Sequence, residues 1–189
     1  MDIKQEFTID LPVSKVWTAL SNVQLVADCL PGAELGEALS DTKFKGSLNT
    51  KLGPIATEFL GEVDIERKED ELLGILQAKG HDRRSGTRVK ARTTYQLQEF
   101  GKGTIVAMES KVALTGSLAQ FARQGLIEDV ARELTAEFSK VLEAKLSAKT
   151  EAEADAIVAS ELNPVAIVLK GIVNRILAPL KRLFRSELG

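Results

Sequence analysis

A long run of alternating apolar and polar residues, from Ala33 to Thr115, constrains the fold of this chain more than any other feature. Apolar or small side chains occupy every second position, and charged side chains occupy most of the positions between them. This period is typical of β-strands that bury one face, and a sheet with one face in water is antiparallel. Turn residues divide the run at Gly53-Pro54, Glu69-Asp70, Ser85-Gly86 and Gly101–Gly103. The run therefore predicts an antiparallel meander.

The segments on either side of the meander predict a further strand and several helices. Alternation from Ile3 to Leu11 indicates a strand, Pro12 opens a short helix, and a second short helix ends before Pro31. Residues 117–146 have the helical period and predict one helix of up to about 30 residues, roughly 45 Å long. A helix of that length must cover the apolar face of the sheet, because nothing else in the chain can. The predicted class is α+β.

Small residues at inward positions of the sheet and helix suggest an unfilled interior. They include Gly46, Gly61, Ala91, Ser110 and Ala122. A curved sheet under one long helix then leaves room for a ligand, with a few neutral polar groups to orient it. The alternative is that these residues only relieve sheet curvature and that the core is filled.

We predict that inward side chains of the strands and helices line this pocket, with Tyr95, Thr93 or Ser110 as hydrogen-bond donors. The predicted lining comprises Trp17, Leu30, Phe44, Leu48, Phe59, Val63, Ala91, Thr93, Tyr95, Met108, Ser110, Val112, Phe121, Leu126 and Val130.

The residue types argue against several classes of chemistry. No carboxylate pair, nucleophile with a base, or metal-ligand cluster falls on the predicted inward face, so we expect no catalytic residues, no metal and no covalently bound cofactor. Cys29 is the single cysteine and His81 the single histidine. With no disulfide possible and no apolar signal segment after Met1, we expect a cytoplasmic setting. The acidic body argues against nucleic acid as a partner.

The last segment, residues 163–189, differs from the rest in charge and pattern. Residues 162–189 contain five basic and one acidic side chain, a net charge of +4, whereas the whole chain carries −2. Apolar residues recur there every three or four positions, and basic residues interrupt them, so a spanning helix is not expected. The residues predicted to contact a membrane surface are Val165, Leu169, Lys170, Ile172, Val173, Arg175, Ile176, Leu180, Lys181, Arg182, Leu183, Phe184 and Arg185.

We interpret this segment as an interfacial helix with its apolar face among the acyl chains and its basic residues at anionic head groups. Two alternatives remain open: the stripe packs on the domain itself, or it docks in a groove of a partner protein. Residues 147–162, before it, form either a helical spacer or a mobile linker.

Three local motifs resemble the CoxG family, which is named after a subunit of carbon monoxide dehydrogenase. They are Cys29-Leu30-Pro31-Gly32-Ala33, Gly86-Thr87-Arg88-Val89, and the segment from Gly116 to Arg123 followed by Leu126, Ile127, Val130 and Ala131. The element order is similar to the START/Bet v 1-like (SRPBCC) helix-grip fold, a curved sheet of about seven strands that grips a long helix. The resemblance covers residues 1–146, and the chain departs from it at Ala122, where family members often have glycine.

The resemblance implies a protein associated with a molybdenum-containing carbon monoxide dehydrogenase, or a related hydroxylase, at the membrane. In members with a tail helix it also implies delivery of a respiratory quinone. We therefore expect a non-catalytic carrier: residues 1–146 bind a lipophilic ligand, menaquinone or ubiquinone, and the tail rests peripherally on the cytoplasmic face of the cytoplasmic membrane. The alternatives are an adaptor that recruits the dehydrogenase, and an enzyme of the polyketide cyclase or aromatase kind, which needs ionisable residues in the pocket.

Overall fold

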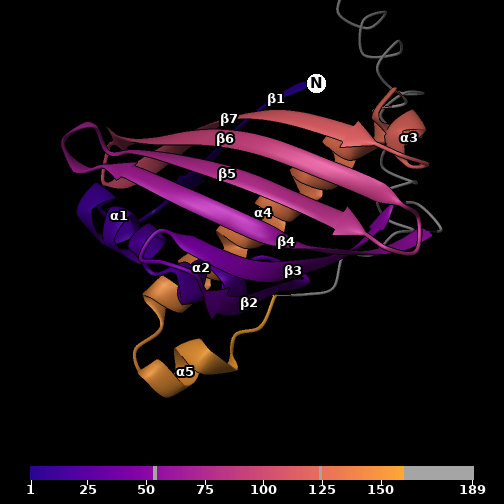
Figure 1. Ribbon diagram of the computed structural model, residues 1–189. Helices are drawn as coiled ribbons and strands as arrows, with labels where there is room; N and C mark the ends of the chain where they lie inside the picture. The colour runs from indigo at the N-terminus through magenta and orange to yellow at the C-terminus, as the bar shows by residue number, and fades with distance from the viewer. Residues whose placement is uncertain (53–54, 124, 160–189) are drawn as a thin grey trace, which may run out of the picture.

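The computed structural model describes residues 1–52, 55–123 and 125–159. The predicted membrane-binding tail, residues 163–189, lies outside the described residues, as do the end of the predicted linker and the Gly53-Pro54 turn. The described part is a curved antiparallel sheet with helices on its inner face (Figure 1).

The sheet contains seven strands in the order β1-β7-β6-β5-β4-β3-β2. Every neighbouring pair is antiparallel. The strands are β1 (Asp2–Ile9), β2 (Ala33–Ala38), β3 (Lys43–Leu52), β4 (Ile55–Lys68), β5 (Leu73–Asp82), β6 (Thr87–Phe100) and β7 (Gly103–Thr115). Strands β2 to β7 follow one another as a meander and β1 adds to the edge beside β7, so the predicted antiparallel meander is confirmed.

The helices begin where the sequence offers capping groups. They are α1 (Val13–Ser21), α2 (Val23–Cys29), the 3₁₀ turn η1 (Glu69–Glu71), α3 (Ala119–Arg123), α4 (Leu126–Ser147) and α5 (Glu151–Ala156). The Asn22 side chain caps α2 by accepting a hydrogen bond from the Leu25 backbone N–H at 3.1 Å. Thr150 caps α5 in the same way, so part of the predicted linker is helical.

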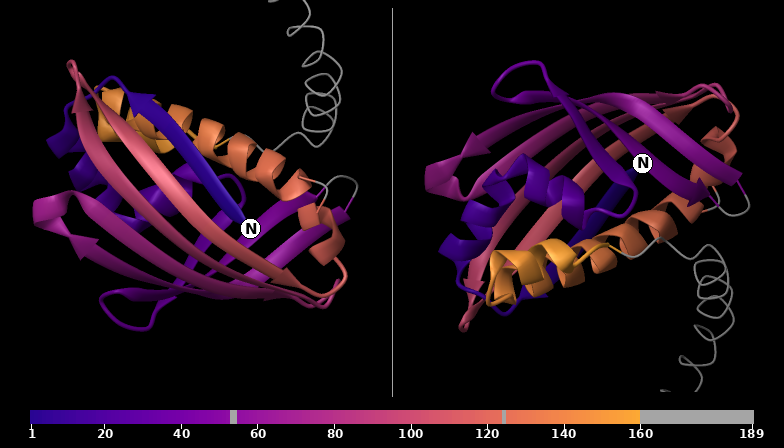
Figure 2. Two further views of the ribbon diagram at one scale, coloured as in Figure 1. Left: turned by 90° about the horizontal axis from the view of Figure 1, so that it is seen from above. Right: turned by 90° about the horizontal axis from the view of Figure 1, so that it is seen from below.

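The single long helix predicted over residues 117–146 is wrong in one respect, because the structure has two helices there. Gly125, directly before α4, has φ +75°, a left-handed conformation that other residues rarely adopt. The remaining helix α4 has 22 residues, about 33 Å at 1.5 Å per residue. It runs diagonally across the inner face of the sheet (Figure 2). This is the helix-grip arrangement, and the predicted fold class is confirmed.

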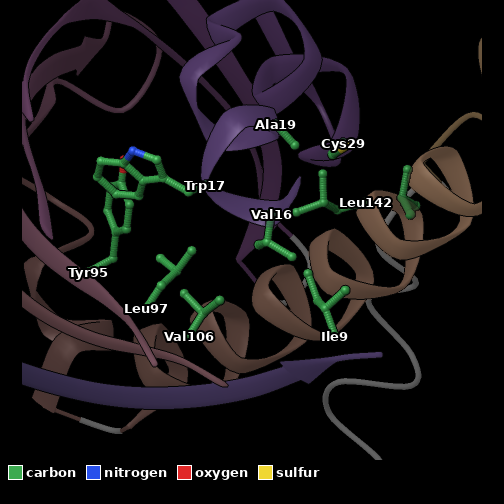
Figure 3. Close-up of a cluster of buried hydrophobic side chains, with 10 residues drawn as sticks. Ile9, Val16, Trp17, Ala19, Cys29, Tyr95, Leu97, Val106 and Leu142 are labelled. Carbon is green, nitrogen blue, oxygen red and sulfur yellow. The ribbon is translucent and has the colours of Figure 1, made fainter. Parts of the chain in front are cut away.

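Two clusters of buried apolar side chains join the helices to the sheet. The first lies at the end covered by α1, α2 and the C-terminal half of α4 (Figure 3) and contains Ile9, Val16, Trp17, Ala19, Cys29, Tyr95, Leu97, Val106, Val141 and Leu142. The second, at the opposite end of α4, is built on Leu118 and Val130. Between the clusters, the inner face is only partly covered.

A row of glycines crosses the sheet between its two ends. Gly46 pairs with Gly61, and Gly61 pairs with Gly80. A Cβ atom on Gly61 would lie 2.0 Å from the carbonyl oxygen of Lys79, so the backbones approach too closely for any side chain there. At Gly61 the geometry therefore favours the interpretation that small residues permit sheet curvature.

Candidate ligand-binding site

A cavity of about 230 Å³ lies between the inner face of the sheet, helices α1 and α2, and the middle of α4. Fourteen residues line it: Phe7, Leu20, Val23, Val26, Leu30, Ile65, Leu76, Thr93, Tyr95, Val106, Met108, Leu134, Thr135 and Phe138. Most are aliphatic or aromatic, which is typical of sites for apolar ligands.

The walls of the cavity are not packed against one another as a core is. Leu76, Met108, Leu134 and Phe138 all remain partly exposed although they lie between the sheet and the helices. Phe138 meets Phe7 edge to face, with ring centroids 6.0 Å apart, and this contact joins α4 to β1 at one side of the cavity. The apolar interior is therefore accessible at its centre, where a ligand that covers these side chains would remove apolar surface from water.

Two of the polar pairs at the cavity consist of groups that satisfy each other. The hydroxyls of Thr93 and Ser110 lie 2.8 Å apart on neighbouring strands. The Thr135 hydroxyl donates to the side-chain carbonyl of Gln5 at 2.7 Å and so links α4 to β1. Such pairing offsets the cost of placing polar atoms near an apolar space.

A third polar group, at the α1 end of the cavity, is built around Arg67. The guanidinium carbon of Arg67 lies 5.1 Å from the centroid of the Trp17 ring, within cation–π distance. One guanidinium nitrogen donates to the Tyr95 hydroxyl at 3.4 Å. The Trp17 indole N–H donates in turn to the Glu69 carboxylate. Figure 3 shows the Trp17 and Tyr95 rings side by side at one end of the first cluster.

A second hollow, of about 620 Å³, adjoins the cavity on the side of β3 and β4. It shares Leu20, Val23 and Ile65 with the cavity. Asp41, Asp64, Glu66 and Arg67 lie at its rim. We call it the mouth hollow, because its shared lining and its polar rim make it the route from solvent to the cavity.

The residues predicted from sequence to line the pocket divide into two groups. Leu30, Thr93, Tyr95 and Met108 line the cavity. Trp17 lies beside it through its contact with Tyr95, and Ser110 through its bond to Thr93. The part that these residues play in ligand binding remains a prediction.

The other predicted lining residues lie elsewhere on the inner side. Phe59, Phe121, Leu126 and Val130 belong to the second cluster; Phe44 borders the mouth hollow; Ala91 and Val112 border a separate hollow with Lys90; and Leu48 and Val63 lie on β3 and β4 outside the cavity lining. The reason is the diagonal path of α4, which packs onto the far end of the sheet. Alternation predicts which face a side chain occupies, not its distance from the helix.

Several lining residues were missing from the sequence prediction. Phe7, Ile65, Val106, Leu134 and Phe138 belong to the periodic stripes that predicted the elements themselves, so the signal was present. The expectation that no ionisable residue faces inward is wrong at Arg67. Its position follows from alternation, because Arg67 lies two residues after the inward Ile65, and its register partner Gly74 pairs with Tyr95. Stacking on Trp17 lets this charge lie on an otherwise apolar face.

The described residues offer little that is typical of a catalytic or metal centre. They contain no group of three or more His, Cys, Asp or Glu side chains placed to hold a metal ion. Burial raises the pKa of the Cys29 thiol to about 11, so this side chain is protonated at neutral pH and belongs to the core. His81 is exposed on the outer side of β5. Among the described helices none is long and apolar enough to cross a membrane.

Solved structures share this architecture at low sequence identity. A conserved protein from Geobacillus kaustophilus matches with a TM-score of 0.68 and 16% identity, over 78% of this chain and 95% of that protein. A protein from Thermus thermophilus matches with a TM-score of 0.57 and 13% identity, over 78% and 100% of the two chains. The ZhuI aromatase/cyclase from Streptomyces sp. R1128 matches with a TM-score of 0.58 and 12% identity, over 77% and 93%. These similarities show the fold, and because one neighbour is an enzyme, they leave the presence or absence of catalysis open.

The sequence itself gives a more specific assignment. No curated protein matches the chain significantly. The sequence model of CoxG, a family of carbon monoxide dehydrogenase subunits, matches residues 6–147, which include all seven strands from the second half of β1 onward and the whole of α4. The match agrees with the motifs at Cys29–Ala33, Gly86–Val89 and Gly116–Arg123. The chain belongs to the CoxG family.

Proposed function

We propose that this protein is a carrier that takes a lipophilic ligand, a respiratory quinone such as menaquinone or ubiquinone, into the cavity and delivers it to a molybdenum-containing carbon monoxide dehydrogenase or a related hydroxylase. Membership of the CoxG family and the helix-grip fold support a ligand-binding role connected with that dehydrogenase. The observation that carries the proposal is the accessible apolar cavity, with walls such as Leu76 and Met108 left partly exposed.

The size of the cavity indicates how a quinone would be held. Its volume of about 230 Å³ lies below the roughly 300–1,000 Å³ usual for sites that enclose a whole drug-sized ligand. A quinone ring would therefore occupy the cavity, and its isoprenoid chain would extend through the mouth hollow. A chain that leaves through an open mouth needs a lipid surface close by, because its remaining apolar area is unfavourable in water.

The amphipathic segment at residues 163–189 would supply that surface by binding peripherally to the cytoplasmic face of the membrane. The support for this step is the sequence pattern alone: a net charge of +4 over residues 162–189 beside an apolar stripe. Attachment of this kind weakens as the ionic strength rises.

Copurification from native membranes tests the carrier function. Full-length protein and a variant that ends before Asn163 are purified without harsh detergent, and the bound lipids are identified by mass spectrometry. We expect a prenylated quinone in the full-length preparation and much less in the truncated one. A full-length preparation free of quinone and of any other prenylated or acyl species would overturn the carrier function.

A second candidate function is an adaptor that recruits the dehydrogenase, and one observation favours it. The outward positions of β6 carry Arg88, Lys90 and Arg92, which are exposed and form no ion pair among the described residues. Lys90 lies directly opposite Lys79, and Arg92 opposite Lys111. We call these five residues the basic strip. Like charges placed opposite one another destabilise a sheet, so the strip is suited to an acidic partner surface.

Binding of the purified dehydrogenase at several salt concentrations tests the adaptor function. The double substitution Lys90→Glu and Arg92→Glu should weaken binding and reduce its salt dependence, whereas Lys102→Glu, at the β6–β7 turn, serves as the matched control. Equal binding by both variants would argue against the strip.

A further inference from the structure

Arg67 differs from the other charged residues around the cavity. Of the described residues that line the cavity or the mouth hollow, Asp41, Asp64 and Glu66 are exposed, whereas the Arg67 side chain is partly buried. It lies on the inner face of β4, in the same cross-strand row as Gly74, Tyr95 and Met108. A cation is thus placed at the point where the mouth hollow meets the apolar cavity.

The surrounding residues hold Arg67 and Tyr95 in place. The Trp17 ring supports the guanidinium at 5.1 Å, and Trp17 is itself anchored by its hydrogen bond to Glu69. The Tyr95 ring lies directly against Gly74, where a Cβ atom would come within 2.1 Å of the ring. Glycine at this position is what allows the hydroxyl of Tyr95 to reach Arg67.

The hydrogen-bonding capacity of this pair is largely unused. A guanidinium group has five N–H donors, and among the described residues Arg67 forms a single hydrogen bond and no ion pair. The Tyr95 hydroxyl accepts that bond, so its own proton is available to another acceptor. The Thr93–Ser110 and Thr135–Gln5 pairs, by contrast, already satisfy each other.

We propose that Arg67 and Tyr95 form the head-group site of the cavity and bind an acceptor oxygen, a carbonyl or carboxylate oxygen, at the polar end of an amphipathic ligand. The inference rests on the proposed function in one respect, namely that the cavity takes a lipophilic ligand. It adds the chemistry of the polar end: both groups donate hydrogen bonds, and one is a fixed positive charge that suits a carbonyl or carboxylate oxygen. A ligand with a cationic head group is disfavoured by charge repulsion.

Three probes of similar length separate the contributions of the apolar body and the head group. Decylubiquinone offers carbonyl oxygens, dodecanoate offers a carboxylate, and decylbenzene offers no acceptor. Their dissociation constants are measured by equilibrium dialysis on the full chain. Trp17, the single tryptophan of the chain, provides a fluorescence signal from the site itself, since its ring touches Arg67.

We expect Arg67→Gln to weaken binding of at least one of the two oxygen-bearing probes by tenfold or more and to change binding of decylbenzene by less than twofold. The loss with decylubiquinone assigns the acceptor to a carbonyl, and the loss with dodecanoate assigns it to a carboxylate. Tyr95→Phe retains the ring on Gly74, so it should give a smaller loss in the same direction. Arg92→Gln, which removes an exposed cation from the outer face, is the matched control and should change nothing.

Two results would overturn the head-group site: unchanged binding of both oxygen-bearing probes by Arg67→Gln and Tyr95→Phe, or an equal loss for all three probes. Should Arg67→Gln fail to fold, Tyr95→Phe and Arg67→Lys, which retains the charge, provide the same comparison. If the wild-type chain binds none of the three probes, the carrier function fails. If it binds all three and the variants behave as the wild type does, only the head-group site fails.

Discussion

The two ends of the space between the sheet and α4 contain similar residue types and are filled to different extents. At the α1 end, Ile9, Val16 and Leu142 are completely buried, with 0% of their surface exposed. A few residues away, Leu76 and Met108 are equally apolar and remain partly exposed around the cavity. Apolar composition alone therefore does not distinguish a core from a binding site. The distinction lies in whether a helix reaches the sheet at that point.

The largest expected effect tests whether the two ends differ energetically. Leu142→Ala should lower the free energy of unfolding by about 2–5 kcal/mol, because it creates a cavity in a filled core. Met108→Ala should cost less than about 1.5 kcal/mol, because it enlarges an existing hollow. Urea denaturation of both variants measures the difference. Equal losses would mean that the centre is as well packed as the end.

The next effect concerns Gly74, which lies at the boundary between the filled and the unfilled region. Gly74→Ala should destabilise the protein by about 1–3 kcal/mol, since the new methyl group overlaps the Tyr95 ring. Gly80→Ala, on the same face of β5, meets its nearest atoms at 3.4 Å and should change stability by less than about 0.5 kcal/mol. Thermal unfolding measures both, and a shift in Trp17 fluorescence should accompany only the first. A harmless Gly74→Ala would refute the close seating of Tyr95.

Filling the cavity gives a sharper test of its role. Leu76→Trp places a large side chain in the cavity and should weaken decylubiquinone binding at least about tenfold, or 1.4 kcal/mol. Gln77→Trp introduces the same residue one position along, on the outer face, and should leave affinity unchanged. Retained affinity in Leu76→Trp, or equal loss in both variants, would show that the ligand binds elsewhere. An adaptor without cargo would still recruit its dehydrogenase in either variant.

The smallest effect concerns the far end of the sheet, where the β5–β6 turn is stabilised by polar contacts. Hydrogen bonds from the Ser85 hydroxyl at 2.6 Å and from the backbone N–H groups of Arg84 and Ser85 lower the pKa of the Asp82 carboxyl. Because this pKa is lower in the folded state, the stabilisation is present above the ordinary value of 3.8 and is lost as the pH falls through the lowered value.

Asp82→Asn should therefore lower the melting temperature by a few degrees at pH 7, and the difference from the wild type should shrink as the solution is acidified towards pH 3. Asp41→Asn, in the exposed β2–β3 turn, is the control and should follow the wild type throughout. A difference that grows in acid would contradict the assigned role of Asp82.

The fold was largely predictable because its signals are local. Alternation fixes which face of a strand is buried, and the strands β2 to β7 follow in order, so neighbours in sequence are neighbours in space. The break before α4 was not predicted, because the helical period continues through Gly125 and one glycine with a positive φ interrupts it.

The candidate site was predictable only in part. Thr93, Tyr95 and Met108 line the cavity because they are inward residues near its centre, whereas the equally inward Phe59 and Val130 pack at the far end. The alternation that placed Ile65 inward also placed Arg67 inward, and an apolar interior gave no reason to look for an arginine there. Its stacking on Trp17 links two residues that lie far apart in the chain, which no local pattern contains.

By itself, the sequence determined the order of the elements, the buried face of each strand, the amphipathic character of the last segment, and the family. The tertiary structure decided where the interior stays open and which groups meet at its polar end. The physical reason is that periodicity depends on residues a few positions apart, whereas a cavity depends on the angle at which α4 crosses the sheet. The Arg67–Tyr95–Trp17 cluster likewise exists only once β4, β6 and α1 lie side by side.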